Sequence, residues 1–135
     1  MNFSATVSIE RDLYKMDVVS GGGNTLVADE PVEVGGQNIG FSPDELLCAS
    51  LGACTSATLR MYADRKGWPL ERVEVNVFFE RENAFSETNL FRKIRLVGNL
   101  TDDQRARLMD VAGKCPMHKT LSQPISIITD LEIEK

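Results

Sequence analysis

The sequence predicts an α+β fold in which antiparallel strands accompany one long helix. Residues 2–10 alternate apolar and polar side chains, as half-buried strands do, and residues 13–19 repeat the alternation after a turn at residues 11–12. The run GGGN at residues 21–24 predicts a further turn, which leads into a short strand at residues 25–28. The chain is therefore expected to begin as a three-stranded meander.

A long helix is predicted over residues 42–67. Ser42 is suited to cap its first turn, Glu45 follows three residues later as a capping box requires, and Gly67 is suited to end it. Residues 46–59 carry no charge and place apolar groups almost all round the helix. One small sheet cannot cover every face of such a helix, so we expect the chain to form a homodimer.

The rest of the chain continues the two patterns, alternation for strands and capping residues for helices. They predict strands at residues 73–79 and 90–100, a helix from 101 to about 113, a short helix at 115–121 and a closing strand at 125–133. Strands grouped between helices indicate an α+β fold with antiparallel sheets. The length of 135 residues predicts a single domain, residues 1–135.

Residues 29–41 form a loop that leaves two interpretations open. Pro31 and the glycines at 35, 36 and 40 mark this stretch as a loop. The loop is either a lid that faces a substrate or a plain connection to the long helix, and connections are the commoner use of loops of this length.

Charge and composition exclude several classes of function. The net charge is −5 and the pI is about 4.9, which disfavours a nucleic-acid surface. The uncharged run at residues 46–59 is too short to cross a membrane, and residues 1–12 lack the pattern of a secretory signal. We therefore expect a cytoplasmic protein. Its three cysteines, an odd number, do not suggest a secreted disulfide framework.

Cys115 stands where a helix start would activate a thiol. In GKCPMHKTL, Pro116 takes the first helical position, so Cys115 becomes the N-cap. Unpaired backbone N–H groups and the helix dipole lower the pKa of a thiol there. Lys114 and His118 are near enough in sequence to add positive charge. The alternative is a cysteine that merely caps a short helix.

The other cysteines and the one histidine are more ambiguous. Cys54 lies among small residues in the long helix, where a thiol is usually packing. Cys48 precedes it by six residues and faces another side of the helix. His118 is either a proton or charge donor near Cys115 or an ordinary surface side chain. A zinc site made of these four residues lacks the usual ligand spacing.

Two carboxylates, Asp44 and Glu45, open the long helix. Their position at the positive end of the helix dipole is a sufficient structural explanation. Asp44 precedes Cys54 by ten residues, about 15 Å along a straight helix. It would reach that thiol only through a bridging group such as an arginine.

Three stretches together resemble the OsmC/Ohr family of thiol-dependent hydroperoxide reductases, and most closely its broad OsmC-like branch. They are SPDELLCASLGACTSATLRMYADRKGWPLERV at residues 42–73, ADEPVEVGGQNIGFSP at 28–43 and GKCPMHKTL at 113–121. The resemblance implies an OsmC-like fold. In that fold, two long helices of an intertwined homodimer are wrapped by sheets that both chains build.

The resemblance also implies an activity: a cofactor-free, peroxiredoxin-like peroxidase that takes part in the oxidative-stress response. By match, Cys54 attacks an organic hydroperoxide and becomes a sulfenic acid, and Cys115 condenses with it to a disulfide that an external dithiol, such as a lipoylated protein, reduces. The residue-level argument instead prefers Cys115 as the thiol of lower pKa. Both hold if the two helices meet, because Cys115 is then a good leaving group.

One feature departs from the family pattern. Well-studied members stabilise the thiolate with an arginine from the N-terminal sheet or the loop after it, held by an acid near the start of the long helix. Asp44 matches that acid, with Glu45 beside it, but no arginine lies between Arg11 and Arg60. The activating cation comes from the partner chain, is replaced, or is missing. If it is missing, the chain is expected to be a catalytically weak protein that binds small molecules or responds to redox state; a purely structural interaction domain is a third possibility.

Overall fold

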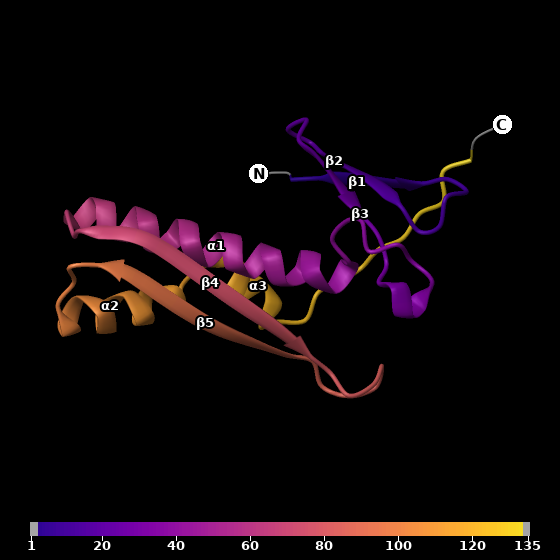
Figure 1. Ribbon diagram of the computed structural model, residues 1–135. Helices are drawn as coiled ribbons and strands as arrows, with labels where there is room; N and C mark the ends of the chain where they lie inside the picture. The colour runs from indigo at the N-terminus through magenta and orange to yellow at the C-terminus, as the bar shows by residue number, and fades with distance from the viewer. Residues whose placement is uncertain (1–2, 134–135) are drawn as a thin grey trace. The chain divides into compact units, whose positions relative to one another are not determined.

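The computed structural model describes residues 3–133, and its contacts divide the chain into two compact units. The first comprises Met1–Ser50 and Val77–Phe91, and the second comprises Leu51–Asn76 and Arg92–Lys135. The element order is β1(Ala5–Ile9), β2(Met16–Ser20), β3(Thr25–Ala28), η1(Val32–Val34), α1(Pro43–Lys66), β4(Leu70–Glu80), β5(Asn89–Gly98), α2(Asp102–Ala112) and α3(Pro116–Leu121) (Figure 1). The predicted α+β class is confirmed, whereas the single domain stays a prediction.

The first unit contains the predicted meander. Strands β1, β2 and β3 pair in sequence order and antiparallel, with Val18 opposite Val7 on one side and Leu26 on the other. The third strand has the predicted bounds, and the first two are shorter than predicted; residue 2 lies outside the described residues. The first strand was expected to be half-buried. That expectation is wrong for this chain, because all five residues of β1 are exposed.

Asp29 organises the loop that follows β3. Its carboxylate accepts backbone N–H hydrogen bonds from Tyr14 at 3.2 Å, Glu30 at 2.7 Å, Gln37 at 3.0 Å and Ile39 at 3.3 Å. The side chain is fully buried, so these donors replace the water that a carboxylate requires. This anchoring favours the connection over the lid.

The loop also closes tightly on itself. A Cβ at Gly36 would collide with the Glu30 carbonyl, so only glycine fits there. Ser42 and Glu45 then start α1 through the predicted capping box: the Ser42 backbone N–H donates to the Glu45 carboxylate at 2.9 Å, and the Glu45 N–H donates to the Ser42 hydroxyl at 3.2 Å.

The second unit holds the hydrophobic core. Its fully or nearly fully buried residues come from three elements: Leu59 and Ala63 of α1, Leu70 of β4, and Leu108, Val111 and Ala112 of α2. Burying a leucine side chain contributes roughly 1.5–3 kcal/mol, so this cluster is the main apolar stabilisation of the unit. Figure 1 shows the hairpin of β4 and β5 running beside α1 and α2.

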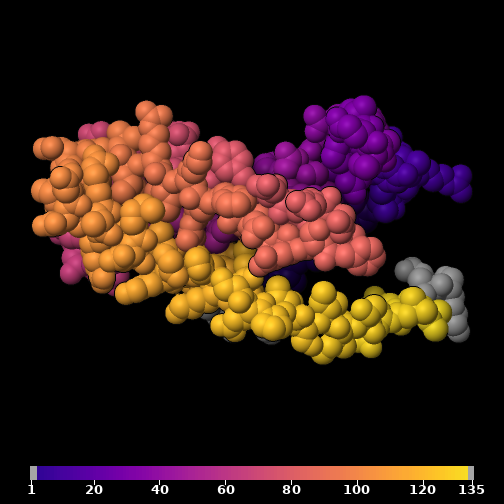
Figure 2. Space-filling view, turned by 90° about the horizontal axis from the view of Figure 1, so that it is seen from below, coloured from indigo at the N-terminus to yellow at the C-terminus, as the bar shows by residue number. Residues whose placement is uncertain are grey.

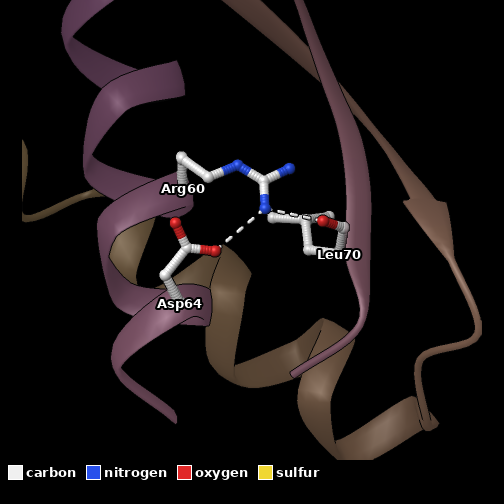
Figure 3. A network of polar contacts seen from close by, with 3 residues as sticks. All are labelled: Arg60, Asp64 and Leu70. Atoms are coloured by element: carbon white, nitrogen blue, oxygen red, sulfur yellow. Dashed lines mark hydrogen bonds and ion pairs between the residues drawn. The ribbon is translucent and has the colours of Figure 1, made fainter. Parts of the chain in front are cut away.

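Arg60 ties the end of α1 to the start of β4. Its Nη1 atom donates to the Leu70 carbonyl at 2.6 Å and to the Asp64 carboxylate at 3.1 Å (Figure 3). Gly67 ends the helix with a φ of 70°, a left-handed conformation that glycine adopts without strain. These contacts set the direction in which the chain enters the β4–β5 hairpin.

The predicted closing strand at residues 125–133 is absent from the described chain. The backbone there pairs with no described strand, and the segment's large apolar side chains are exposed: Ile125, Ile127, Ile128, Leu131 and Ile133. Figure 2 shows this stretch as a yellow strip on the surface. A strand requires a hydrogen-bonding neighbour, and the alternation of side chains cannot supply one.

Replacing Asp29 tests the loop anchor. Burial raises the pKa of this carboxyl, but the four backbone donors more than offset that effect and hold the pKa below its ordinary value. The stabilisation is therefore complete above the unfolded-state pKa, about 3.9, and is lost as the pH falls through the lower folded-state pKa. We expect Asp29→Asn to lower the urea midpoint at neutral pH, and the difference from wild type to shrink in acid.

Asp17→Asn is the matched control, because Asp17 is an exposed aspartate of β2. Its urea midpoint should stay near that of the wild type. Equal midpoints for Asp29→Asn and Asp17→Asn at neutral pH would contradict the anchoring role of Asp29.

Candidate functional site

Cys115 is the N-cap of α3, as predicted. Its Sγ atom accepts the backbone N–H of His118 at 3.3 Å, and Pro116 occupies the first helical position. The side chain is fully buried. A sulfur held in this way is shielded from solvent and already faces the donors that stabilise a thiolate.

Cys54 comes from α1 and meets the same turn of α3. Its Sγ atom accepts the backbone N–H of Met117 at 3.4 Å, and its thiol also hydrogen-bonds to Cys115. The two cysteines, which are far apart in the sequence, thus lie close together, and α1 meets α3 at this point. Cys54 is half-buried, so it is the more accessible of the two sulfurs.

Thr55 links this thiol pair to its surroundings. Its hydroxyl donates to the Leu51 carbonyl at 2.7 Å and lies 3.8 Å from the Cys115 sulfur. Arg92 of β5 donates from Nη1 to the same hydroxyl oxygen at 3.1 Å. The threonine is completely buried, so its hydroxyl group depends on these partners for its hydrogen bonds.

Arg92 also contacts His118. The Nη2 atom lies 3.0 Å from His118 Nδ1. A guanidinium has only donors, so Nδ1 must accept and carries no proton. A charge near Cys115 was one of two interpretations open for His118; the cation whose charge lowers the Cys115 pKa is Arg92, and Lys114 is exposed.

The environment of Cys115 lowers its pKa. Burial raises the pKa of the thiol, but hydrogen bonds from the His118 N–H, Thr55 and Cys54, together with the charge of Arg92, outweigh burial and bring the pKa below its ordinary value. The preference for Cys115 as the thiol of lower pKa thus has a structural basis. What the site offers chemically is a buried thiol of lowered pKa beside a half-buried cysteine.

Arg92 was missed in the sequence, although a signal was present. The cation of the family pattern precedes the long helix, whereas Arg92 lies after it, in β5. In β5, Leu90, Arg92, Ile94 and Leu96 share the half-buried positions and alternate with exposed residues. Arg92 thus lies on the same face of the strand as these apolar side chains. A charged residue on that face requires a polar partner, and this position in the pattern could have identified Arg92.

Cys48, Asp44 and Glu45 lie near the start of α1. Burial raises the pKa of the Cys48 thiol, and the charges of Asp44 and Glu45 raise it further. The described contacts of Glu45 are those of the helix cap. The catalytic roles that the resemblance implies for the two acids stay predictions.

A metal site finds no support in the described part of the chain. No group of three or more histidine, cysteine, aspartate or glutamate side chains is placed to hold an ion among residues 3–133. Within the same residues, no helix has the length and apolar character needed to cross a membrane.

The fold and site define an α+β protein with a paired-thiol centre. Residues 35–130 match the family model described as OsmC-like protein, and the chain belongs to this family. The comparison with curated proteins found no match.

Several solved structures share the fold. An OsmC-like protein from Mycoplasma pneumoniae is 22% identical with a TM-score of 0.77, and the match covers 90% of this chain and 88% of that one. An organic hydroperoxide resistance protein OsmC from Legionella pneumophila is 21% identical, with a TM-score of 0.68 and coverages of 90% and 89%. An organic hydroperoxide resistance protein from Elizabethkingia anophelis is 19% identical, with a TM-score of 0.68 and coverages of 89% and 87%.

The raised pKa of Cys48 predicts a poorly reactive thiol. In Cys54→Ser/Cys115→Ser, Cys48 is the remaining thiol, and its alkylation near neutral pH should be slow because little thiolate is present. Adding Asp44→Asn should speed alkylation about twofold or more by removing a repelling charge. Adding Asp103→Asn, an exposed first-turn acid of α2, is the control and should have no effect. Fast alkylation of the starting variant would contradict the assignment.

Proposed function

We propose that the chain is a thiol-dependent peroxidase that reduces organic hydroperoxides to alcohols. The observation that carries the proposal is the pairing of Cys54 with Cys115, one half-exposed and one buried in a turn that stabilises a thiolate. Family membership and the names of the Legionella and Elizabethkingia relatives support hydroperoxides as the substrate class.

In the proposed reaction Cys54 is the nucleophile. Its thiolate attacks the distal peroxide oxygen, the O–O bond breaks, and the alkoxide takes up a proton and leaves as an alcohol. Cys54 is now a sulfenic acid. The Cys115 thiolate attacks its sulfur, which forms the Cys54–Cys115 disulfide and releases hydroxide that is protonated to water. An external dithiol, such as a lipoylated protein, restores both thiols in a reducing cytoplasm.

The family match extends the proposed site to Asp44 and Glu45 at the start of α1. They match the acid of the family pattern. The proposal requires no metal or organic cofactor, because the cysteine sulfurs supply the two electrons that reduce the peroxide.

Removing the nucleophile is the direct test of the peroxidase. Cys54→Ser should lower dithiol-dependent consumption of an organic hydroperoxide by at least about a hundredfold, since a serine hydroxyl is a poor substitute for a thiolate. Cys48→Ser is the matched control and should retain activity. Mass spectrometry after one equivalent of peroxide should show wild-type protein lighter by two hydrogen atoms.

Two results would contradict the peroxidase. One is undiminished peroxide consumption in both Cys54→Ser and Cys115→Ser. The other is a wild-type protein whose thiols survive the peroxide unchanged, which would favour a binding protein.

The functional protein is proposed to be a homodimer. On α1, Ala49, Ala53, Ala57 and Met61 recur every four residues, so they share one face, and all four are exposed. Small residues in this spacing allow a second helix to approach closely. The exposed apolar segment at residues 125–133 and the exposed β1 likewise require a cover that a second copy would supply.

Charging this helix face tests the dimer. Wild type should elute as a dimer at micromolar concentration, and Ala57→Glu should shift it to a monomer because the interface would bury an unpaired charge. Ala106→Glu, at an exposed alanine of α2, should remain dimeric. A stable wild-type monomer at micromolar concentration would refute the dimer.

A further inference from the structure

Arg92 is fixed in the second unit by two contacts to two different helices. One nitrogen of its guanidinium donates to Thr55 of α1 and the other to His118 of α3, at 3.1 Å and 3.0 Å. These helices supply Cys54 and the turn that caps Cys115. The rigid fork of an arginine is suited to hold two acceptors at once, which a lysine cannot do in the same geometry.

The Thr55 hydroxyl is placed to carry the influence of Arg92 to the Cys115 sulfur. It has one hydrogen and two acceptors within reach, the Leu51 carbonyl at 2.7 Å and Cys115 at 3.8 Å. When Cys115 is a thiol, its S–H can donate to Thr55 while Thr55 donates to Leu51. When Cys115 is a thiolate, the hydroxyl can turn toward sulfur. The hydrogen bond from Arg92 makes that hydroxyl a stronger donor.

The remaining neighbours act in the same direction. Cys54 of α1 hydrogen-bonds to Cys115, Arg92 of β5 acts on it through its charge, and the His118 backbone N–H donates to it at 3.3 Å. The His118 ring faces Arg92 through Nδ1, which accepts its hydrogen bond. Burial opposes an anion at Cys115, whereas these donors and the charge of Arg92 stabilise it.

We propose that Arg92 is a positioning residue that, through Thr55 and His118, stabilises the thiolate form of Cys115 and makes Cys115 the leaving sulfur when a dithiol reduces the Cys54–Cys115 disulfide. The second half of this statement rests on the proposed function, which supplies the disulfide. The first half concerns the reduced protein and needs no substrate.

The reduction step follows from the exposure of the two sulfurs. A thiolate of the dithiol attacks Cys54, the half-exposed sulfur, and the S–S bond breaks with its electron pair on buried Cys115. The second thiol of the reductant, as its thiolate, then attacks the mixed disulfide. This releases Cys54, which takes up a proton, and leaves the reductant as a disulfide. A stabilised Cys115 thiolate speeds the first of these steps because a thiol of lower pKa leaves faster.

The test begins with a protein whose remaining thiol is Cys115. In Cys48→Ser/Cys54→Ser, the serine at position 54 can still donate a hydrogen bond, and the ultraviolet absorbance of the thiolate can be followed against pH. Adding Arg92→Gln should move the midpoint upward by about one pH unit. Arg92→Lys should restore part of the shift. Arg95→Gln, an exposed arginine of the same strand 3.9 Å from Glu74, is the matched control and should leave the midpoint unchanged.

The result that overturns the proposal is a midpoint for Arg92→Gln that moves no more than that of Arg95→Gln, with circular dichroism showing both variants folded. If Arg92→Gln does not fold, Thr55→Val decides. It keeps the side-chain shape and removes the hydroxyl, so the midpoint should rise, and an unchanged midpoint overturns the proposal.

The second measurement uses the cysteines of the native protein. The disulfide is formed with a chemical oxidant other than peroxide and then reduced with dithiothreitol. Arg92→Gln should be reduced several-fold more slowly than wild type or Arg95→Gln, and equal rates overturn the leaving-group role. The shifted midpoint and slower reduction without any peroxide consumption would uphold Arg92 and refute the peroxidase. Peroxide consumption with neither effect would do the reverse.

Discussion

The hydrogen bonds from the first turn of α3 to two sulfur atoms are the interaction on which this site depends. Met117 donates its backbone N–H to Cys54 and His118 donates to Cys115. The first turn of a helix has backbone N–H groups without intrahelical partners. In α3, two of these groups donate to thiols that are far apart in the sequence. Because backbone groups cannot be lost by substitution, they hold the two sulfurs together independently of the side chains around them.

The charge at the site has a different origin from its geometry. Arg92 reaches the thiols from β5, through Thr55 on one helix and the ring of His118 on another. The strand that supplies it lies between the two helices in sequence and beside both in the second unit. One side chain can therefore bias the protonation of Cys115 and link the elements that carry the cysteines. This coupling explains why a half-buried charge is tolerated, since its donors are met by polar acceptors.

Much of the fold followed from local patterns because local physics decides them. The capping box at Ser42 and Glu45, the one that starts α2 at Thr101, and the cysteine cap of α3 are all present. Alternation located β3 and the β4–β5 hairpin. It failed at residues 125–133 and misjudged the burial of β1, since alternation describes a side-chain pattern and not whether another segment covers it or pairs with it.

The sequence alone determined the family, the helix caps and the two cysteines, because each is a short pattern of residue types at fixed spacing. The family pattern places the activating cation before the long helix, where the sequence has no arginine between Arg11 and the helix. Only the tertiary structure brought Cys54 to Cys115 and placed Arg92 beside Thr55 and His118. The physical reason is that hydrogen bonds and charges act over a few ångströms in space, and residues 37 or 60 positions apart become neighbours only when helix and strand pack together.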